Sequence, residues 1–248
     1  YGWSNSKKGN MIMKQEIGLR MRPFRDENDF WRIRDFLREV FMLNQRLERS
    51  WSVPRLDYWR WHYIQTCEAG AMEKVTYLWE TSNGLLAAVL HPIDRGEAYL
   101  HVHPEYRSVS LEHEIFECAE QHLFGTYSGG TRKLFALSDE DDPLRQEVLQ
   151  SRGYSWRDQP VKRWRRDLNR PLPAVLLPDG YTIRSMGDAR DFRARAWASW
   201  RAFHPDEPDE DFEGGDWYAN LQSASPYRRD LDMVVEAPGG EIAAFCTI

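Results

Sequence analysis

One stretch decides the fold, Glu97-Ala-Tyr-Leu-His-Val-His-Pro-Glu-Tyr-Arg-Ser-Val-Ser-Leu-Glu-His-Glu-Ile-Phe116. Apolar and polar side chains alternate from Ala98 to His103, and this period of two predicts a β-strand. Pro104 has no N–H to give to a ladder and ends the strand. From Ser110 apolar residues return at helical spacing, so a helix through Leu123 follows. A strand, a tight turn and a helix aim free backbone N–H groups at an anion.

The turn His103-Pro-Glu-Tyr-Arg107 resembles the entry to the acetyl-CoA site of the GNAT (Gcn5-related N-acetyltransferase) family. In that family the motif Q/R-x-x-G-x-G/A follows, and its amides hold the CoA pyrophosphate. Arg107 matches the motif, whereas Ser110 and Glu112 stand where the two small residues belong. A carboxylate at Glu112 would repel the pyrophosphate by roughly a few kcal/mol. The resemblance therefore implies an acetyl-CoA site that has been lost.

The resemblance also indicates which residues would bind acetyl-CoA, the cosubstrate of the family. Strand amides would hold the pantetheine arm and turn amides the pyrophosphate; the positions are Leu100, His101, Val102, His103, Arg107, Ser108, Val109, Ser110 and Leu111. The tyrosine that protonates the leaving thiolate in the family falls at Leu149, and the family's alanine on the same helix falls at Arg145. Leucine cannot donate a proton, so we expect an inactive first domain and assign no catalytic residue.

Composition excludes several classes of function. The formal charge of −6 argues against a general nucleic-acid binder. Three separated cysteines indicate neither a disulfide framework nor a zinc site, and a cytoplasmic location is the natural interpretation. No apolar run approaches the roughly 18 residues of a membrane span. His101 and His103 share a strand face but have no third ligand at a fitting spacing, so we expect no metal.

Periodicity places the remaining elements of the first domain. We expect strands over residues 17–22, 75–80, 85–90, 133–138 and 154–168, and helices over residues 28–41, 56–66 and 143–152. The loop 44–54 lies where the GNAT family covers its substrate. The basic run 161–166 is either a guarded edge strand or a nucleic-acid patch, and the net charge favours the edge strand.

The sequence repeats itself. Arg22, Asp26, Asp29 and Phe30 recur as Arg184, Asp188, Asp191 and Phe192, at an offset of 162 (184 − 22). Asp57-Tyr-Trp59 recurs as Asp216-Trp-Tyr218, and Gly84-Leu-Leu-Ala-Ala-Val89 recurs as Gly240-Glu-Ile-Ala-Ala-Phe245. We therefore expect an α/β protein with a mostly antiparallel GNAT sheet flanked by helices, in one complete copy and the N-terminal part of a second.

The repeat sets the expected boundaries. Residues 1–16 form a disordered or cloning-derived tail, residues 17–170 the first domain, residues 171–179 a proline-rich linker and residues 180–248 the second domain. Ile248 corresponds to Pro92 (248 − 156), which precedes the acetyl-CoA turn of the first copy. We interpret the chain as a fragment whose second domain is cut before that turn.

The resemblance implies acetyl transfer from acetyl-CoA to a primary amine of a small molecule or peptide, with the working site in the second domain. The acidic loop Phe203–Asp211 suits a cationic acceptor, although its composition favours a solvated surface loop. The alternative is a non-catalytic scaffold or regulatory module with the same fold. We expect no nucleic-acid or membrane partner, and a homodimer stays open.

Overall fold

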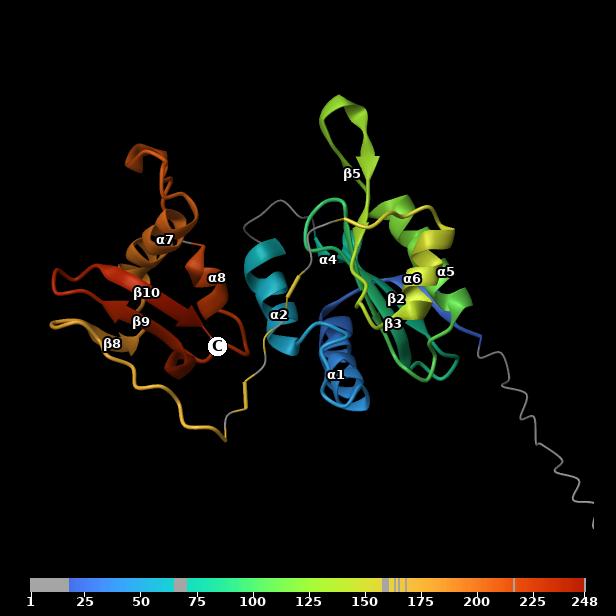
Figure 1. Cartoon of the computed structure of the whole chain (residues 1–248), viewed down its shortest axis with the longest axis horizontal. Helices are drawn as coiled ribbons and strands as arrows, with labels where there is room; N and C mark the ends of the chain where they lie inside the picture. Colours follow the sequence, from blue (N-terminus) through green and yellow to red (C-terminus); the bar gives the residue numbers. More distant parts are fainter. Residues whose placement is uncertain are drawn as a thin grey trace, which may run out of the picture.

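The computed structural model of the chain describes residues 18–64, 71–157, 161–162, 164, 166–167, 169–215 and 217–247 (Figure 1). The expected N-terminal tail, Ile17, Cys67 and Ile248 lie outside these residues, as do parts of the basic run 161–166. In the described residues a sheet of five strands precedes a sheet of three strands. We call the elements of residues 18–157 the first unit and those of residues 182–247 the second unit.

The first unit is built on the five-stranded sheet. Its strands are β1 (Arg20–Pro23), β2 (Tyr77–Glu80), β3 (Leu86–His91), β4 (Glu97–Val102) and β7 (Phe135–Ala136), in the order β1-β2-β3-β4-β7. Only β4 and β7 run parallel, so the sheet is mixed and mostly antiparallel. The helical elements are α1 (Glu27–Leu43), α2 (Val53–Tyr58), the π-helix η1 (Trp59–Tyr63), α4 (Met72–Val75), α5 (Val109–His122) and α6 (Pro143–Ser151). A small hairpin carries β5 (Gly125–Thr126), η2 (Ser128–Gly130) and β6 (Arg132–Lys133).

Each face of this sheet has its own hydrophobic core. Because side chains alternate along a strand, Leu78 and Val89 pack on one face with Phe30 and Ile33 of α1. On the other face Leu100 packs with residues of α5 and α6, among them Ile115 and Val148. Helices therefore cover both faces of a mostly antiparallel sheet, and the predicted α/β fold class is confirmed (Figure 1).

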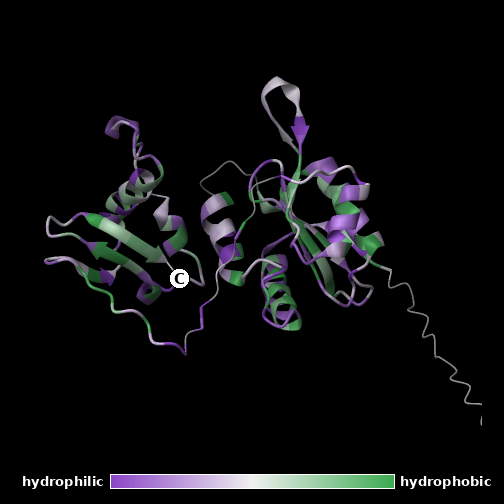
Figure 2. Cartoon of the chain, viewed as in Figure 1, coloured by the Kyte–Doolittle hydropathy of each residue, from purple (hydrophilic) through white to green (hydrophobic). Residues whose placement is uncertain are grey.

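The second unit has a smaller sheet of β8 (Thr182–Ser185), β9 (Asp232–Glu236) and β10 (Ile242–Thr247), antiparallel throughout. Its helical elements are α7 (Ala189–Phe203), η3 (Asp209–Asp211), α8 (Tyr218–Gln222) and η4 (Arg229–Leu231). The order is strand, helix, helix and hairpin, as it is from β1 to β3. A small apolar core around Phe192, Tyr218 and Val234 joins its helices to its sheet. Figure 2 shows hydrophobic stretches along the strands of this sheet.

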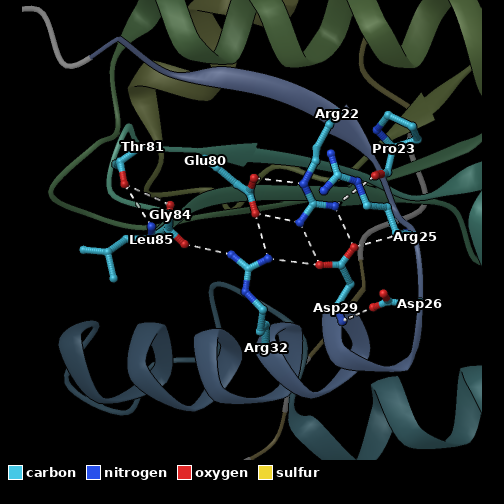
Figure 3. Close-up of polar contacts among 10 residues, drawn as sticks. All are labelled: Arg22, Pro23, Arg25, Asp26, Asp29, Arg32, Glu80, Thr81, Gly84 and Leu85. Carbon is cyan, nitrogen blue, oxygen red and sulfur yellow. Dashed lines mark hydrogen bonds and ion pairs between the residues drawn. The ribbon is translucent and has the colours of Figure 1, made fainter.

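One ion triad ties together the first strand, the first helix and the hairpin of the first unit (Figure 3). Arg22 of β1 donates to both carboxylate oxygens of Asp29 in α1, at 2.6 and 2.7 Å, and to Glu80 at the end of β2, at 2.8 and 2.6 Å. Arg32 also contacts both acids and donates to the carbonyl of Gly84. We call Arg22, Asp29 and Glu80 the first triad.

The second unit contains the same triad. Arg184 of β8 lies 2.6 Å from Asp191 in α7 and 2.7 Å from Glu236 at the end of β9. Arg184 and Asp191 are the repeat partners of Arg22 and Asp29. Glu236 corresponds to Glu80 at an offset of 156 (236 − 80), the same offset that separates Gly240 from Gly84. The second unit thus makes the same contacts at the positions that the sequence repeat makes equivalent.

Three predicted elements differ in the structure. Described residues between 154 and 168 form no strand, and Trp156 and Trp164 are 69% and 92% exposed, so neither tryptophan is held by a partner strand or by a core. The strand expected over 133–138 is divided, because β6 pairs with β5 whereas β7 pairs with β4. The helix expected from Leu56 begins at Val53, where Pro54 occupies the first turn.

No helix among the described residues has the length and apolar character to cross a bilayer.

Arg22→Met should destabilise the first unit by about 3 kcal/mol, because it leaves Asp29 buried without its bidentate partner. The matched change Arg184→Met should cost no more than about 1 kcal/mol, since Arg184 and Glu236 are each about one-third exposed. Urea unfolding followed by circular dichroism measures both. Equal losses of unfolding free energy in the two variants would contradict the claim that burial makes the first triad the more stabilising one.

Candidate functional site

The parallel strands β4 and β7 part after two residue pairs. The paired positions are Glu97 with Phe135 and Ala98 with Ala136, and β4 continues alone to Val102. In the antiparallel ladder with β3, His103 N–H donates to the Ala87 carbonyl, so alternate residues bond to β3. Leu100 and Val102 therefore turn their backbone N–H and C=O groups toward the side where β7 has ended.

A cleft opens where the two strands part. It is lined by the loop after α1, by α2, by β4, by the segment after β7 and by α6; its residues are Glu48, Arg49, Ser50, Trp51, Ser52, Arg55, Tyr99, Leu100, His101, Leu137, Asp139 and Arg145. We call this the β4–β7 cleft. Part of the loop 44–54, expected over the substrate, thus borders the open edge of β4.

Two buried histidines below the cleft form a directed hydrogen-bond relay. His91 Nδ1 lies 3.0 Å from the Pro92 carbonyl, which only accepts, so Nδ1 carries the proton. Burial lowers the pKa of His91 to about 4, and the ring is neutral with Nε2 as an acceptor. His101 Nε2, 2.9 Å away, must then donate, and His101 Nδ1 accepts from the Trp51 N–H at 3.4 Å. Burial, together with the neighbouring His91, also holds the pKa of His101 well below its usual value.

Ion pairs close the turn that resembles the pyrophosphate site. Glu112 is fully buried and accepts from Arg107 Nε at 2.7 Å and from Arg145 of α6 at 3.1 and 3.2 Å. Arg107 also donates to both oxygens of Asp142, at 2.7 and 2.6 Å. We call these four residues the turn network. Two cations meet two anions in it, so it presents little net charge to a ligand.

The other predicted site residues lie along one path from β4 to α5. Ser108 is the N-cap of α5 and accepts from Leu111 N–H at 3.2 Å, whereas Val109 and Ser110 are exposed. Leu111 points into the core. His103 is buried, with Nε2 3.8 Å from Glu39. No group of three His, Cys, Asp or Glu residues in the described part of the chain could hold a metal ion.

The structure adds residues that the strand-turn-helix pattern did not indicate. His91 follows an apolar run at the end of β3, and nothing in the sequence marks its contact with His101. Trp51 and Arg55 enter the cleft from a loop and a short helix. Arg145 did carry a signal, because an arginine stands where the family has alanine. Leu149, at the position of the family's tyrosine, packs against the core of α5 and α6.

No protein-family model and no curated protein matches the chain. Among solved structures, a GCN5-related N-acetyltransferase from Sphaerobacter thermophilus is similar, with a TM-score of 0.51 and 17% identity over 92% of this chain and 71% of that one. This likeness shows that the chain has the GNAT fold.

Two further solved structures are more distant. One is a tandem GNAT protein from the clavulanic acid biosynthesis pathway, with a TM-score of 0.45 and 13% identity over 92% of this chain and 73% of that one. The other is the glucosamine N-acetyltransferase region of a fungal multi-domain β-N-acetylglucosaminidase. Its TM-score is 0.36, with 13% identity over 94% of this chain and 28% of that one.

The buried histidine relay predicts a loss of stability in mild acid. Folding lowers the pKa of His91 and His101, so below about pH 6.5 the unfolded chain binds more protons than the folded protein does. The free energy of unfolding therefore decreases as the pH falls, down to about pH 4. We expect the free energy of unfolding to decrease by roughly 1 kcal/mol per pH unit for each ring. Urea unfolding between pH 7.5 and pH 5 measures it.

The matched control is His122→Gln, on the exposed end of α5, which should keep the full acid dependence. His101→Gln should reduce it. If the free energy of unfolding of His101→Gln depended on pH as strongly as that of the natural protein, the relay would not be the source of the acid sensitivity.

Proposed function

We propose that the chain is part of an acetyl-CoA-dependent N-acetyltransferase that acetylates a primary amine, and that its first unit is not the working site. The reaction would be direct attack of a neutral amine on the thioester, with no covalent enzyme intermediate. The GNAT fold supports the reaction class. The parted strands β4 and β7, with open backbone groups at Leu100 and Val102, support a common origin of the first unit with acetyl-CoA binders.

The observation that carries the proposal for the first unit is the buried carboxylate of Glu112. It lies in the first turn of α5, where a helix N-terminus would otherwise attract an anion. Arg107, which matches the family motif, is already bonded to Glu112 and Asp142. A pyrophosphate would have to separate a buried carboxylate from two guanidinium groups, which costs several kcal/mol.

Leu149 adds an independent argument. It packs among apolar residues and has no acidic proton to transfer to a thiolate. The turn and the acid are separate requirements of the reaction, and both are unmet in the first unit.

The second unit supports the tandem arrangement. It repeats the element order of β1 to β3 and the Arg-Asp-Glu triad. We propose that it begins a second GNAT copy after the linker 171–179. In this fold the acetyl-CoA strand and turn follow the hairpin, so the working site would lie in the part of the fold that follows β10.

The acceptor side of the second unit is proposed to include the acidic loop Phe203–Asp211. Arg201 of α7 donates to the carbonyls of His204, Pro205 and Glu207 and pairs with Asp209, which gives the loop a defined path. The side chains of Asp206, Glu207 and Glu210 are exposed. Carboxylates so placed would attract a cationic amine before it loses its proton.

A scaffold role is the second candidate for the first unit, and one contact favours it. His62 of η1 lies against Trp217, which precedes α8, with ring centroids 4.4 Å apart. The first unit thus packs on the second through a helix that does not border the β4–β7 cleft. A unit without a cosubstrate site could in this way hold its neighbour in place.

Calorimetric titration of acetyl-CoA into the whole chain tests the proposal. The natural sequence should release no binding heat. Glu112→Gly/Arg145→Ala, which restores the small residues of the family at both positions, should gain binding in the micromolar range, because the buried carboxylate is removed from the turn. Glu117→Gly, an exposed position of the same helix, is the control and should stay silent.

Micromolar binding by the natural sequence would contradict the proposal that the first unit is closed. If the double variant gave no binding heat and had an unchanged circular dichroism spectrum, the turn network would not be what excludes the cosubstrate.

A further inference from the structure

The two units meet at a contact that lies outside the β4–β7 cleft. α8 of the second unit packs against η1 of the first unit, which continues α2 (Figure 1). The ring of His62 contacts two aromatic side chains there, Tyr58 of α2 at 4.8 Å and Trp217 at 4.4 Å between ring centroids. Trp217 is the repeat partner of Tyr58 (217 − 159), so both copies contribute the same aromatic position to one contact.

Arg195 of α7 stands where the first unit has an apolar residue. At the offset of 162 it corresponds to Ile33, which is fully buried in the core of the first unit. Arg195 is only 7% exposed, and its guanidinium lies 3.3 Å from the ring centroid of Phe245 and 5.0 Å from that of Tyr218. The second unit therefore buries a cation at a position where the first copy buries an isoleucine.

The second unit gives this cation no carboxylate partner of its own. Among the described residues no salt bridge includes Arg195, and its Nε and Nη1 atoms have no hydrogen-bond partner. The carboxylate of Asp232, whose charge acts on Arg195, already accepts from three hydroxyl groups, those of Tyr218, Tyr227 and Thr247. Aromatic faces attract a guanidinium without neutralising it. The positive charge of Arg195 therefore acts on the groups that cover it.

The first unit covers Arg195 with uncharged groups. Burial lowers the pKa of His62 to about 4, and the charge of Arg195 adds to this shift, so the ring is neutral at pH 7. Burial also lowers the pKa of Arg195, while Tyr218, Asp232 and Tyr58 oppose that shift, and the guanidinium stays protonated. A neutral ring tolerates the buried cation, whereas a second positive charge beside it would be repelled and a negative one attracted.

We propose that η1 and α8 form a docking surface that holds the two units together without the linker 171–179, and that the charge at position 62, facing Arg195, sets its strength. The partner that fits this surface of the first unit is the second unit, which brings an aromatic ring and a buried unpaired cation. The inference goes beyond the proposed function, because it holds whether or not either unit binds acetyl-CoA.

Cleavage of the linker in the whole chain tests the docking surface. Leu172, Val175 and Leu176 are exposed, so a specific protease site built into the linker is accessible. After cleavage at pH 7.5, size-exclusion chromatography shows whether the two parts elute together, and a dilution series gives the dissociation constant. The two parts of the natural sequence should stay associated.

A charge series at position 62 tests the role of Arg195. His62→Lys places a second cation beside Arg195 and should weaken the association by roughly tenfold or more. His62→Glu gives Arg195 a carboxylate and should bind at least as tightly as the natural sequence. In His62→Lys/Arg195→Met the repulsion is absent, so most of the lost affinity should return.

His122→Lys makes the same change in charge at an exposed position of α5. It is the control and should associate as the natural sequence does. Circular dichroism of each variant before cleavage shows whether it is folded.

Separation of the two parts of the natural sequence would overturn the docking surface. If folded His62→Lys associated as tightly as the natural sequence, position 62 would not face Arg195. Equal losses of affinity in His62→Lys and His62→Glu would assign the contact to the packing of the imidazole and overturn the role of charge. No acetyl-CoA is present in these measurements, so their outcome is separate from that of the proposed function.

Discussion

The bidentate pair of Arg22 and Asp29 is the constraint on which the first unit depends. The guanidinium also reaches Glu80, so one buried cation fixes β1, α1 and the end of β2 against each other. With α1 fixed, the loop that follows it is directed to the open edge of β4, where Trp51 meets His101. The geometry of the cleft therefore follows from an ion pair at the far end of α1. The same triad in the second unit indicates that this solution belongs to the fold.

The turn network joins two departures from the family pattern that look unrelated in sequence. Glu112 replaces a small residue in α5, and Arg145 replaces an alanine in α6, 33 residues later. In space they form one ion pair, and each explains the other. A carboxylate alone in that buried position would be strongly destabilising, and an arginine alone would be equally so. Together with Arg107 and Asp142 they form a neutral cluster, in which the protein's own carboxylate takes the place of an external anion.

Local patterns predicted most of the fold. The alternation in β4, the helical spacing of α5 and the patterns of the strands expected over residues 75–80 and 85–90 all depend on neighbours within a few residues, and the structure has these elements. The repeat aligns Arg184 and Asp191 with Arg22 and Asp29, two of the three residues in each triad. The relay of His91 and His101 could not be predicted, since it depends on the register of β3 and β4. The segment after Tyr154 has strand-like composition but exposed tryptophans, because a strand forms only where an edge accepts it.

The turn network also changes what kind of competition a ligand would face. Glu112 is attached to α5 by a few bonds, so its carboxylate meets Arg107 and Arg145 at an effective concentration far above that of a free metabolite. A dissolved pyrophosphate has to displace a tethered competitor that never diffuses away. Under the proposed function, a higher concentration of acetyl-CoA would scarcely open such a turn, whereas substitution of the tethered group would. The first unit would then be a GNAT fold that carries its own inhibitor.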